Sequence, residues 1–487
     1  MKLIPTFAWN KGLHNMTKDG KAFMEQPWAS GGVLIVCVII AMLLANLPWT
    51  RDLYQKVLET SLSMSIQSPT DPVTGMRTID WIFPHEMTVE RFINDILMVV
   101  FFFTVGLEIK REVVCGELSS MKKAMMPVIA AAGGMEVPAL IFTLFNHGTH
   151  GESGWGIPTA TDIAFAVGIM SILGNRVPVS LKVFLTALAI ADDLGAILVV
   201  ALFYGGHVNL ELLCIALVLV AAVLIMNKLG EKRMVYYLVP AIAIWFLFYY
   251  SGVHSTMSGV VMTFLIPMDP RFSHAYLKRR DREYHMRMDK YEENDEVEGL
   301  PFPNALQRHC LRRISTISLG SMGMSYRLEH ALAPWVNFVI MPIFALANAG
   351  VEIPDWSYFD IFQYSPDYGS VGMGVFFGLL LGKPIGISLA SFIAIKGKFG
   401  EMPSNATWKM LFAVACLGGI GFTMSIFVDT LSFGDVPHEI TVELRAIGKI
   451  AVLLGSLSAG ILGSILISVF HKFEKPSTVN SKPQTIQ

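Results

Sequence analysis

Long runs of uncharged, apolar residues constrain this chain more than any other feature. Residues 27–50, 234–268 and 331–351 contain no Asp, Glu, Lys or Arg, and each run is long enough for the roughly 20 helical residues that cross a hydrocarbon core. Only 16% of the chain is charged, against about 25% in an ordinary soluble domain. We therefore predict an all-α integral membrane protein.

Splitting the apolar sequence at proline, glycine and charged clusters predicts about twelve transmembrane helices. We divide the chain into spans one to eight over residues 1–268, a hydrophilic insertion over 269–331, spans nine to twelve over 332–470, and a tail over 471–487. The candidate spans are 29–49, 94–112, 124–146, 155–173, 181–204, 208–227, 234–250, 253–268, 332–351, 371–395, 409–428 and 443–470.

Basic residues predict the orientation of these spans. Alternate loops at 147–154, 205–207 and 352–370 contain no Lys or Arg, whereas the insertion alone contains eleven. Cytoplasmic loops carry the excess of basic residues, so we expect both termini and the insertion to be cytoplasmic. The first apolar run is too long for a signal-peptide core and is predicted to be retained as a helix.

Two hydrophilic segments interrupt the spans. We interpret 269–331 as a solvated, partly disordered cytoplasmic loop, with a regulatory or binding module as the alternative interpretation. In the outer segment 51–93, polar and apolar residues alternate over 61–67, and prolines and a glycine follow between residues 69 and 75. This pattern predicts a small β-hairpin. A lone hairpin is marginally stable, so we expect this segment to join two chains in a homodimer.

Ionisable residues inside apolar spans are costly and therefore suggest function. Asp162 follows Pro158, Thr159 and Thr161 in an otherwise apolar span, so the helix is expected to unwind there. Unwound carbonyls, threonine hydroxyls and carboxylates are hard oxygen ligands that can replace the water around an alkali cation.

Asp192 and Asp193 are adjacent in the middle of another span. Neighbouring helical residues point about 100° apart, so one carboxylate can face an ion while the other meets a second partner. Two carboxylates in a low dielectric should also take up protons readily. Protons would then compete with cations for one site, which is the physical basis of an exchanger.

Lys383 is the natural partner of these acids, because a buried ammonium requires a carboxylate. Gly382 and Gly386 flank it and permit close helix packing. An inert ion pair is the alternative interpretation of any single Asp–Lys contact. A second interrupted span, 418–425 (GGIGFTMS), lies in the other half of the chain. Paired interruptions in two halves indicate an inverted-repeat transporter whose site lies at their crossing.

These motifs together resemble the NhaA family of bacterial sodium/proton antiporters over nearly the whole chain except 269–325. This family is itself one of the transporters from which the link between paired helix interruptions and inverted repeats is known. The resemblance rests on residues 29–32, 94–95, 101–112, 161–166, 191–196, 251–254, 327–330, 382–384 and 419–425.

The resemblance implies inner-membrane localisation, broken fourth and eleventh helices, and electrogenic, pH-regulated exchange of one Na⁺ or Li⁺ for two H⁺. It implies an ion and proton site at Asp192, Asp193 and Thr161, and charge compensation by Asp162 and Lys383. It also implies a pH-sensing group; its candidates are Glu108, Arg111, Glu112, His254, Arg327, Glu329 and His330. Without the family, the acids around Arg111 would be read as an ordinary charge network at the membrane edge.

The chain departs from the family pattern in a few places. Tyr326 stands where a lysine is expected beside the Arg327 motif, and the insertion directly precedes it, which puts the pH set point in doubt. Glu136 and Asp429 are additional acids, which we interpret as groups facing the mouth of the site rather than as new ion sites.

Functions of other classes fit the sequence less well. A cation channel would also carry intramembrane acids, but paired broken helices with titratable carboxylates suit a site that opens to one side at a time. An intramembrane hydrolase would need a His-Glu-x-x-His or Gly-x-Ser-x-Gly motif, and the sequence contains neither. We expect no enzymatic activity and no cofactor. The net charge of −2 gives no reason to expect nucleic acid binding.

Overall fold

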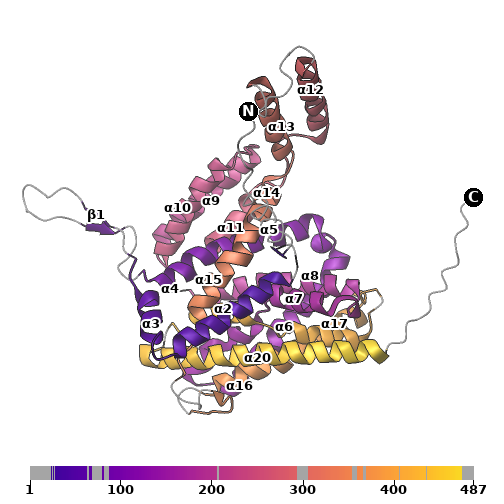
Figure 1. Ribbon diagram of the computed structural model, residues 1–487. Helices are drawn as coiled ribbons and strands as arrows, with labels where there is room; N and C mark the ends of the chain where they lie inside the picture. The colour runs from indigo at the N-terminus through magenta and orange to yellow at the C-terminus, as the bar shows by residue number, and fades with distance from the viewer. Residues whose placement is uncertain are drawn as a thin grey trace, which may run out of the picture. The chain divides into compact units, whose positions relative to one another are not determined.

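The computed structural model of the protein is predominantly helical (Figure 1). It describes residues 23–24, 26, 28–62, 65–67, 79–81, 87–205, 208–292, 305–353, 359–365, 369–404, 406–434 and 436–473. Most of the tail, most of the acidic run at 292–298, and the proline-rich turn at 69–75 lie outside these residues. Helices dominate because a backbone surrounded by lipid must satisfy its own hydrogen bonds.

Eight helices in the described part of the chain are long and apolar enough to cross a membrane, and two bent helix pairs raise the number to ten. The helix α10 (Val235–Ser251) is also apolar but shorter. Each predicted span contains at least one apolar helix, so the all-α membrane class is confirmed. The total of twelve stays a prediction.

The helices form two compact units. Unit 1 comprises residues 1–94, 115–204 and 341–487. Its elements are α2 (Ala29–Asn46), α3 (Arg51–Glu59), β1 (Ser65–Gln67), β2 (Ile79–Trp81), α4 (Val89–Phe92), η2 (Glu117–Ser119), α6 (Met121–Asn146), η3 (His150–Thr159), α7 (Ile163–Leu173), η4 (Gly174–Arg176), α8 (Val179–Phe203), α15 (Met341–Asn348), α16 (Val371–Phe377), η7 (Gly378–Gly382), α17 (Lys383–Lys396), α18 (Trp408–Leu417), α19 (Phe422–Ser432) and α20 (His438–Phe473).

Unit 2 comprises residues 95–114 and 205–340. The π-helix η1 (Ile93–Leu97) begins in unit 1 and leads into α5 (Met98–Cys115). The remaining elements of unit 2 are α9 (Leu210–Lys228), α10, α11 (Met257–Leu265), α12 (His274–Glu292), α13 (Ala305–Gly320), α14 (Met324–Trp335) and η5 (Val336–Ile340).

Glycines set the closest helix contact in unit 1, between α6 and α17. A side-chain carbon at Gly133 would collide with the carbonyl of Gly386, and one at Gly386 would collide with the carbonyl of Gly133. The two backbones therefore touch directly, as small residues allow in membrane helices. This contact fixes α17, which begins with Lys383.

The outer hairpin predicted from the alternation over 61–67 is present. Strand β1 pairs antiparallel with β2, with Ser65 opposite Trp81 and Gln67 opposite Ile79. An isolated bridge between Ser61 and Thr88 continues the pairing toward α4. The hairpin is labelled by β1 in Figure 1.

The described residues of the insertion include two helices, α12 and α13, which pack against each other, and the start of α14. Within α12, Glu283 pairs with Arg280 at 2.6 Å and with Arg287 at 2.8 Å. Such i,i+3 and i,i+4 pairs stabilise exposed helices. The hydrogen bond from Arg280 also lowers the pKa of the partly exposed Glu283 carboxyl.

Candidate ion-binding site

Two bent helix pairs meet in unit 1. The chain bends by 41° between η3 and α7, and by 53° between α18 and α19. Pro158 near the first break lacks a backbone N–H group, and glycines 418, 419 and 421 form the second. The two breaks contact each other directly, since the backbone N–H of Asp162 donates to the carbonyl of Ile420 at 2.6 Å.

Asp162 joins the N-termini of α7 and α19, the second helix of each bent pair. Its Oδ1 caps α7 by accepting from the Phe165 N–H at 3.2 Å. Its Oδ2 accepts from the backbone N–H of Thr423 at 3.2 Å and from the Thr423 hydroxyl. A carboxylate at a helix N-terminus is favourable because the helix dipole is positive there. Asp162 is 2% exposed and compensates two such ends at once.

We call the place where the two helix breaks meet the crossing, and Lys383 lies on the side of it opposite Asp162. Its ammonium donates to Asp192 Oδ2 at 2.5 Å and to the Thr161 hydroxyl oxygen at 3.0 Å. Thr161 Oγ1 in turn lies 2.6 Å from Asp192 Oδ2 and 2.8 Å from the carbonyl oxygen of Gly418. Lys383 and Asp192 are both completely buried. The contact expected between a buried ammonium and the aspartate pair therefore forms with Asp192.

The π-helix η7 immediately precedes Lys383. A π-helical turn shifts the following side chains relative to an α-helix and often occurs at functional sites. Asp193, next to Asp192 on α8, is also buried at 2% exposure. Asp192 Oδ1 accepts no hydrogen bond within the described part of the chain, so one oxygen of this carboxylate is available for a further ligand.

The oxygens gathered here suit an alkali cation. The carboxylate of Asp192 and the carbonyl of Gly418 both lie within hydrogen-bonding distance of the Thr161 hydroxyl. All three groups are hard oxygen ligands. Oxygen atoms of this kind replace the hydration shell of such an ion. The ammonium of Lys383 occupies this position in the structure. A cation bound by the same oxygens would have to displace it.

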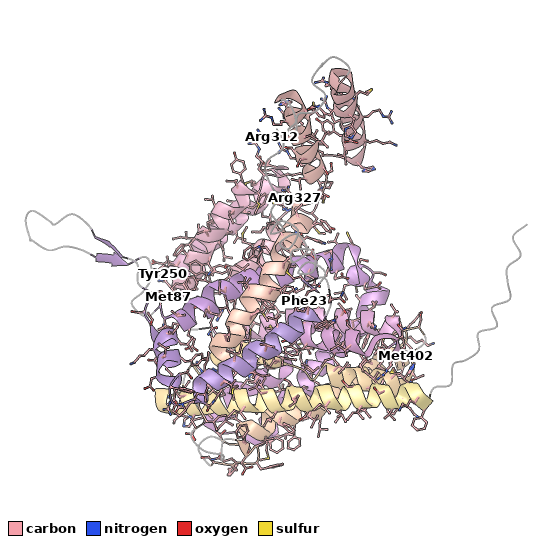
Figure 2. The ribbon with its side chains drawn as sticks, viewed as in Figure 1. Phe23, Met87, Tyr250, Arg312, Arg327 and Met402 are labelled. Carbon is pink, nitrogen blue, oxygen red and sulfur yellow. The ribbon has the colours of Figure 1, made fainter. Side chains whose placement is uncertain are left out.

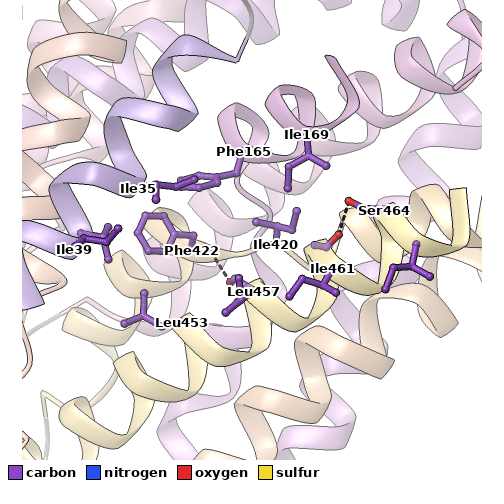
Figure 3. A pocket seen from close by; sticks show the side chains of 14 residues that line it. Ile35, Ile39, Phe165, Ile169, Ile420, Phe422, Leu453, Leu457, Ile461 and Ser464 are labelled. Atoms are coloured by element: carbon purple, nitrogen blue, oxygen red, sulfur yellow. Dashed lines mark hydrogen bonds between the residues drawn. The ribbon is translucent and has the colours of Figure 1, made fainter. Parts of the chain in front are cut away.

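An apolar groove of about 570 Å³ lies beside the crossing (Figure 3). Its walls come from α2, α7, α20 and the second break. Of its two serines, Ser456 accepts from the N–H groups of Gly421 and Phe422, and Ser464 donates to the Gly460 carbonyl. A lining of this kind offers no ligands to a hydrated cation. The residues labelled in the figure include Ile35, Ile39, Phe165, Ile169, Ile420, Phe422, Leu453, Leu457 and Ile461.

Four of the seven pH-sensing candidates lie together in unit 2. Arg111 forms ion pairs with Glu329 at 2.7 Å and with Glu112 at 3.1 Å, and its guanidinium lies 3.9 Å from Glu108. The Arg111 side chain is 36% exposed, whereas Glu329 is 9% exposed. This group, which we call the Arg111 cluster, brings three carboxylates around one guanidinium.

The other three candidates are His254, Arg327 and His330. His330 acts electrostatically on Glu329 of the Arg111 cluster. Arg327 and His330 are exposed on α14, and Arg327 is labelled in Figure 2. The ring of His330 lies against that of Tyr326 at 3.9 Å between centroids, so the tyrosine found in place of the expected lysine packs on the histidine. His254 lies between α10 and α11, with Nδ1 2.7 Å from the Thr256 hydroxyl.

Sequence reasoning missed several buried polar partners in unit 1. Thr423 lay within the recognised glycine-rich motif, and its polarity in that run was a usable signal for a partner of Asp162. Ser456 lies within the apolar α20 and holds the N–H groups at the start of α19. Asn348 exchanges two hydrogen bonds with Asn94 at 3.0 and 2.8 Å. Neither of these two had a local pattern that distinguished it from a packing residue.

Residues 21–467 match the family model described as Na⁺/H⁺ antiporter 1. The chain belongs to this family. It is 38% identical to the Na⁺/H⁺ antiporter NhaA of Pelagibacter ubique, over 93% of this chain and 98% of that protein. It is 40% identical to the Na⁺/H⁺ antiporter NhaA of Acidithiobacillus ferrooxidans, over 95% of this chain and 100% of that protein.

A solved structure, that of the sodium proton antiporter MjNhaP1 from Methanocaldococcus jannaschii, covers 91% of this chain and 98% of its own at 12% identity and a TM-score of 0.43. That similarity is too low to establish a common fold. The sequence matches confirm the resemblance to the NhaA family. Together with the apolar helices, they show a multi-pass membrane protein of a bacterial antiporter family.

Proposed function

We propose that this protein is an electrogenic antiporter that exchanges Na⁺ or Li⁺ for protons across the bacterial inner membrane, with both termini cytoplasmic. The observation that supports it most is the contact of Lys383 with Asp192 and Thr161, completely buried where two helix breaks meet. Its relatives in P. ubique and A. ferrooxidans are named Na⁺/H⁺ antiporters, and the similarity covers nearly their whole lengths.

The exchange follows from competition for the same oxygens. When Lys383 donates to Asp192 and Thr161, no cation can occupy their shared position. An arriving Na⁺ that displaces the ammonium gains Asp192, Thr161 and the Gly418 carbonyl as ligands. The reverse step, proton uptake, removes the negative charge that holds the cation. Cation and proton binding are therefore mutually exclusive at this site.

Asp193 provides the second carboxylate, whose negative charge helps to offset the dehydration of the cation. Because it is the neighbour of Asp192 on α8, its side chain points about 100° away around the helix axis. Two carboxylates can carry two protons in one direction for a single Na⁺ in the other, so each cycle moves one net charge. We propose this stoichiometry and an alternating-access mechanism in which the crossing faces one side of the membrane at a time.

Two further parts of the proposal concern regulation and assembly. The Arg111 cluster would regulate exchange by pH, because protonating any of its three carboxylates removes a partner of the guanidinium. The outer segment 51–93 would join two protomers, since β1 and β2 form a sheet of only two strands whose edges can pair with another chain.

Reconstituted vesicles that contain a trapped pH dye test the exchange directly. Adding Na⁺ outside should move protons, and reversing the Na⁺ gradient should reverse the movement. A channel would instead carry Na⁺ current without a proton flux of opposite direction. Vesicles without protein serve as the control.

The shared site also makes a pH prediction. Protons compete with Na⁺ for the same carboxylates, so the apparent Na⁺ affinity should weaken as the pH falls. Titrating Na⁺ at several pH values measures this. An affinity that does not change with pH would rule out the shared site.

The dimer proposal is tested by deleting residues 61–80, which removes both strands except Trp81. The variant should be monomeric by light scattering in detergent and should still transport. Correctly inserted monomers that fail to transport would show that the segment does more than join protomers.

A further inference from the structure

Asp429 is a buried acid that the proposed exchange does not use. It lies on α19, nearly two turns beyond Thr423. The sequence analysis interpreted it as a group facing the mouth, but its side chain is 0% exposed. Neither carboxyl oxygen has a hydrogen-bond partner in the described residues. Buried polar groups without partners are rare and costly, so each one requires an explanation.

Two cations on the neighbouring helix α20 act on this carboxyl group. They are Arg445 and Lys449, one helical turn apart. Neither forms an ion pair with Asp429 within 4 Å in the part of the chain that the structure describes. The Nε of Arg445 is also buried without a hydrogen-bond partner. A buried acceptor and the buried Nε of Arg445 thus lie near each other without being joined.

Gly448 on α20 makes room for this carboxyl group. A side-chain carbon at position 448 would collide with Oδ1 of Asp429. Asp429 therefore lies directly against the backbone of α20, between the levels of Arg445 and Lys449. Any movement of α19 along α20 would change which of the two cations it can reach.

The other ionisable groups on the elements packed around Asp429 are few. Tyr204, at the end of α8, is within electrostatic reach of it. Glu90 of α4 acts on Lys449. The ionisable residues of η3 lie in its first turn, where Glu152 is bound to His147 and to the Gly148 N–H. The helix α15 has none.

We propose that Asp429 is a positioning residue that holds a proton in the arrangement seen here and, on losing it, pairs with Arg445 and Lys449 and so shifts α19 along α20. An uncharged carboxyl group explains why the two cations stay unjoined. When the O–H bond breaks, the proton leaves to water and the carboxylate accepts hydrogen bonds from α20.

The consequence for transport follows from the contacts of α19. The same helix carries Thr423, whose N–H and hydroxyl bind Asp162 at the crossing. A shift of α19 along α20 therefore acts on the crossing through Thr423. This part of the inference rests on the proposed exchange, whereas the protonation of Asp429 does not.

Asp429→Asn tests the protonation of Asp429 separately from its effect on exchange, because the amide keeps the shape of the side chain but cannot ionise. The infrared difference spectrum between low and high pH should lose one protonated carboxyl band in this variant. Glu443→Gln, which removes a carboxyl group from α20 without touching Asp429, should keep that band. An unchanged spectrum in Asp429→Asn would overturn the proposal, whether or not the protein transports.

Exchange measurements then test the positioning role. Asp429→Asn should exchange like the wild type at low pH and fall behind by about tenfold at high pH, as expected when one proton-linked equilibrium is removed. Asp429→Glu should restore the wild-type profile. Equal losses at every pH, or no loss, would show that Asp429 only fills space.

A second variant covers the case in which Asp429→Asn does not fold. Lys449→Gln leaves the acid in place and removes one of its partners, so it should also lose exchange selectively at high pH. If the wild type itself shows no exchange, the proposed function fails, and the infrared result still decides the protonation of Asp429.

Discussion

The crossing and the Arg111 cluster are both groups of acids around one cation, yet their surroundings differ. Lys383 and Asp192 are both 0% exposed, whereas Arg111 is 36% and Glu329 9% exposed. At the crossing, one ammonium meets one carboxylate and one hydroxyl. In the Arg111 cluster, one guanidinium lies within 4 Å of three carboxylates.

This difference decides what each group can do. Water can screen and replace the partners of Arg111, and exposed ion pairs contribute about 0–1 kcal/mol. No water reaches Lys383, and breaking a buried pair by removing one partner costs about 3–5 kcal/mol. A buried pair can therefore couple ion binding to structure, whereas a partly exposed cluster can adjust its protonation at little structural cost.

The largest expected effect is at Asp193. Asp193→Asn keeps the shape of the side chain and removes the charge that offsets cation dehydration, so exchange should vanish while the protein folds. Proton movement in vesicles and thermal stability in detergent measure the two quantities. If Asp193→Asn still exchanges at wild-type rate, the cation is bound elsewhere and the crossing loses its distinction from the Arg111 cluster.

The next effect concerns the buried pair. Asp192→Asn or Lys383→Gln alone leaves an unpaired buried charge and should destabilise the protein by about 3–5 kcal/mol. The double variant should recover much of this loss, and any residual exchange should carry fewer charges per cycle. Detergent denaturation and currents at zero pH gradient are the measurements. A double variant no more stable than the worse single variant would contradict the pairing.

The smallest effect is expected in the Arg111 cluster. Glu112→Gln removes one of the three carboxylates and should change stability by at most about 1 kcal/mol. The pH at which exchange is half-maximal should nevertheless shift, because the protonation of the cluster changes. Glu117→Gln, beyond the end of α5, serves as a matched control. A stability loss as large as that of the buried pair would remove the contrast drawn between the two groups.

The order of helices could be predicted from the sequence because each helix is a local pattern. Uncharged runs located the apolar helices, and proline and glycine located both breaks, since these residues act on their own backbone. The hairpin followed from alternation in the same way. The helices of the insertion could not be predicted from its composition, because they depend on charged pairs and on packing between α12 and α13.

The site could be predicted only where a residue was anomalous in its own span. Asp162, Asp192, Asp193 and Lys383 are charged residues among apolar ones, so each was visible. Ser456 and Asn348 were not, because serine and asparagine are unremarkable in a membrane helix until their long-range partners are known. Asp429 was visible as an acid, but its burial depends on contact with Gly448 of another helix, α20. Such a contact cannot be read from the sequence around Asp429.

The glycine contact between α6 and α17 has a mechanical consequence. Because the backbones touch at Gly133 and Gly386, no side chains separate these two helices there. We therefore expect α6 and α17 to move together as one rigid body. Lys383, at the start of α17, cannot then leave Asp192 by sliding its helix along α6. Either the Lys383 side chain changes its conformation, or α8, which carries Asp192, moves relative to α6 and α17.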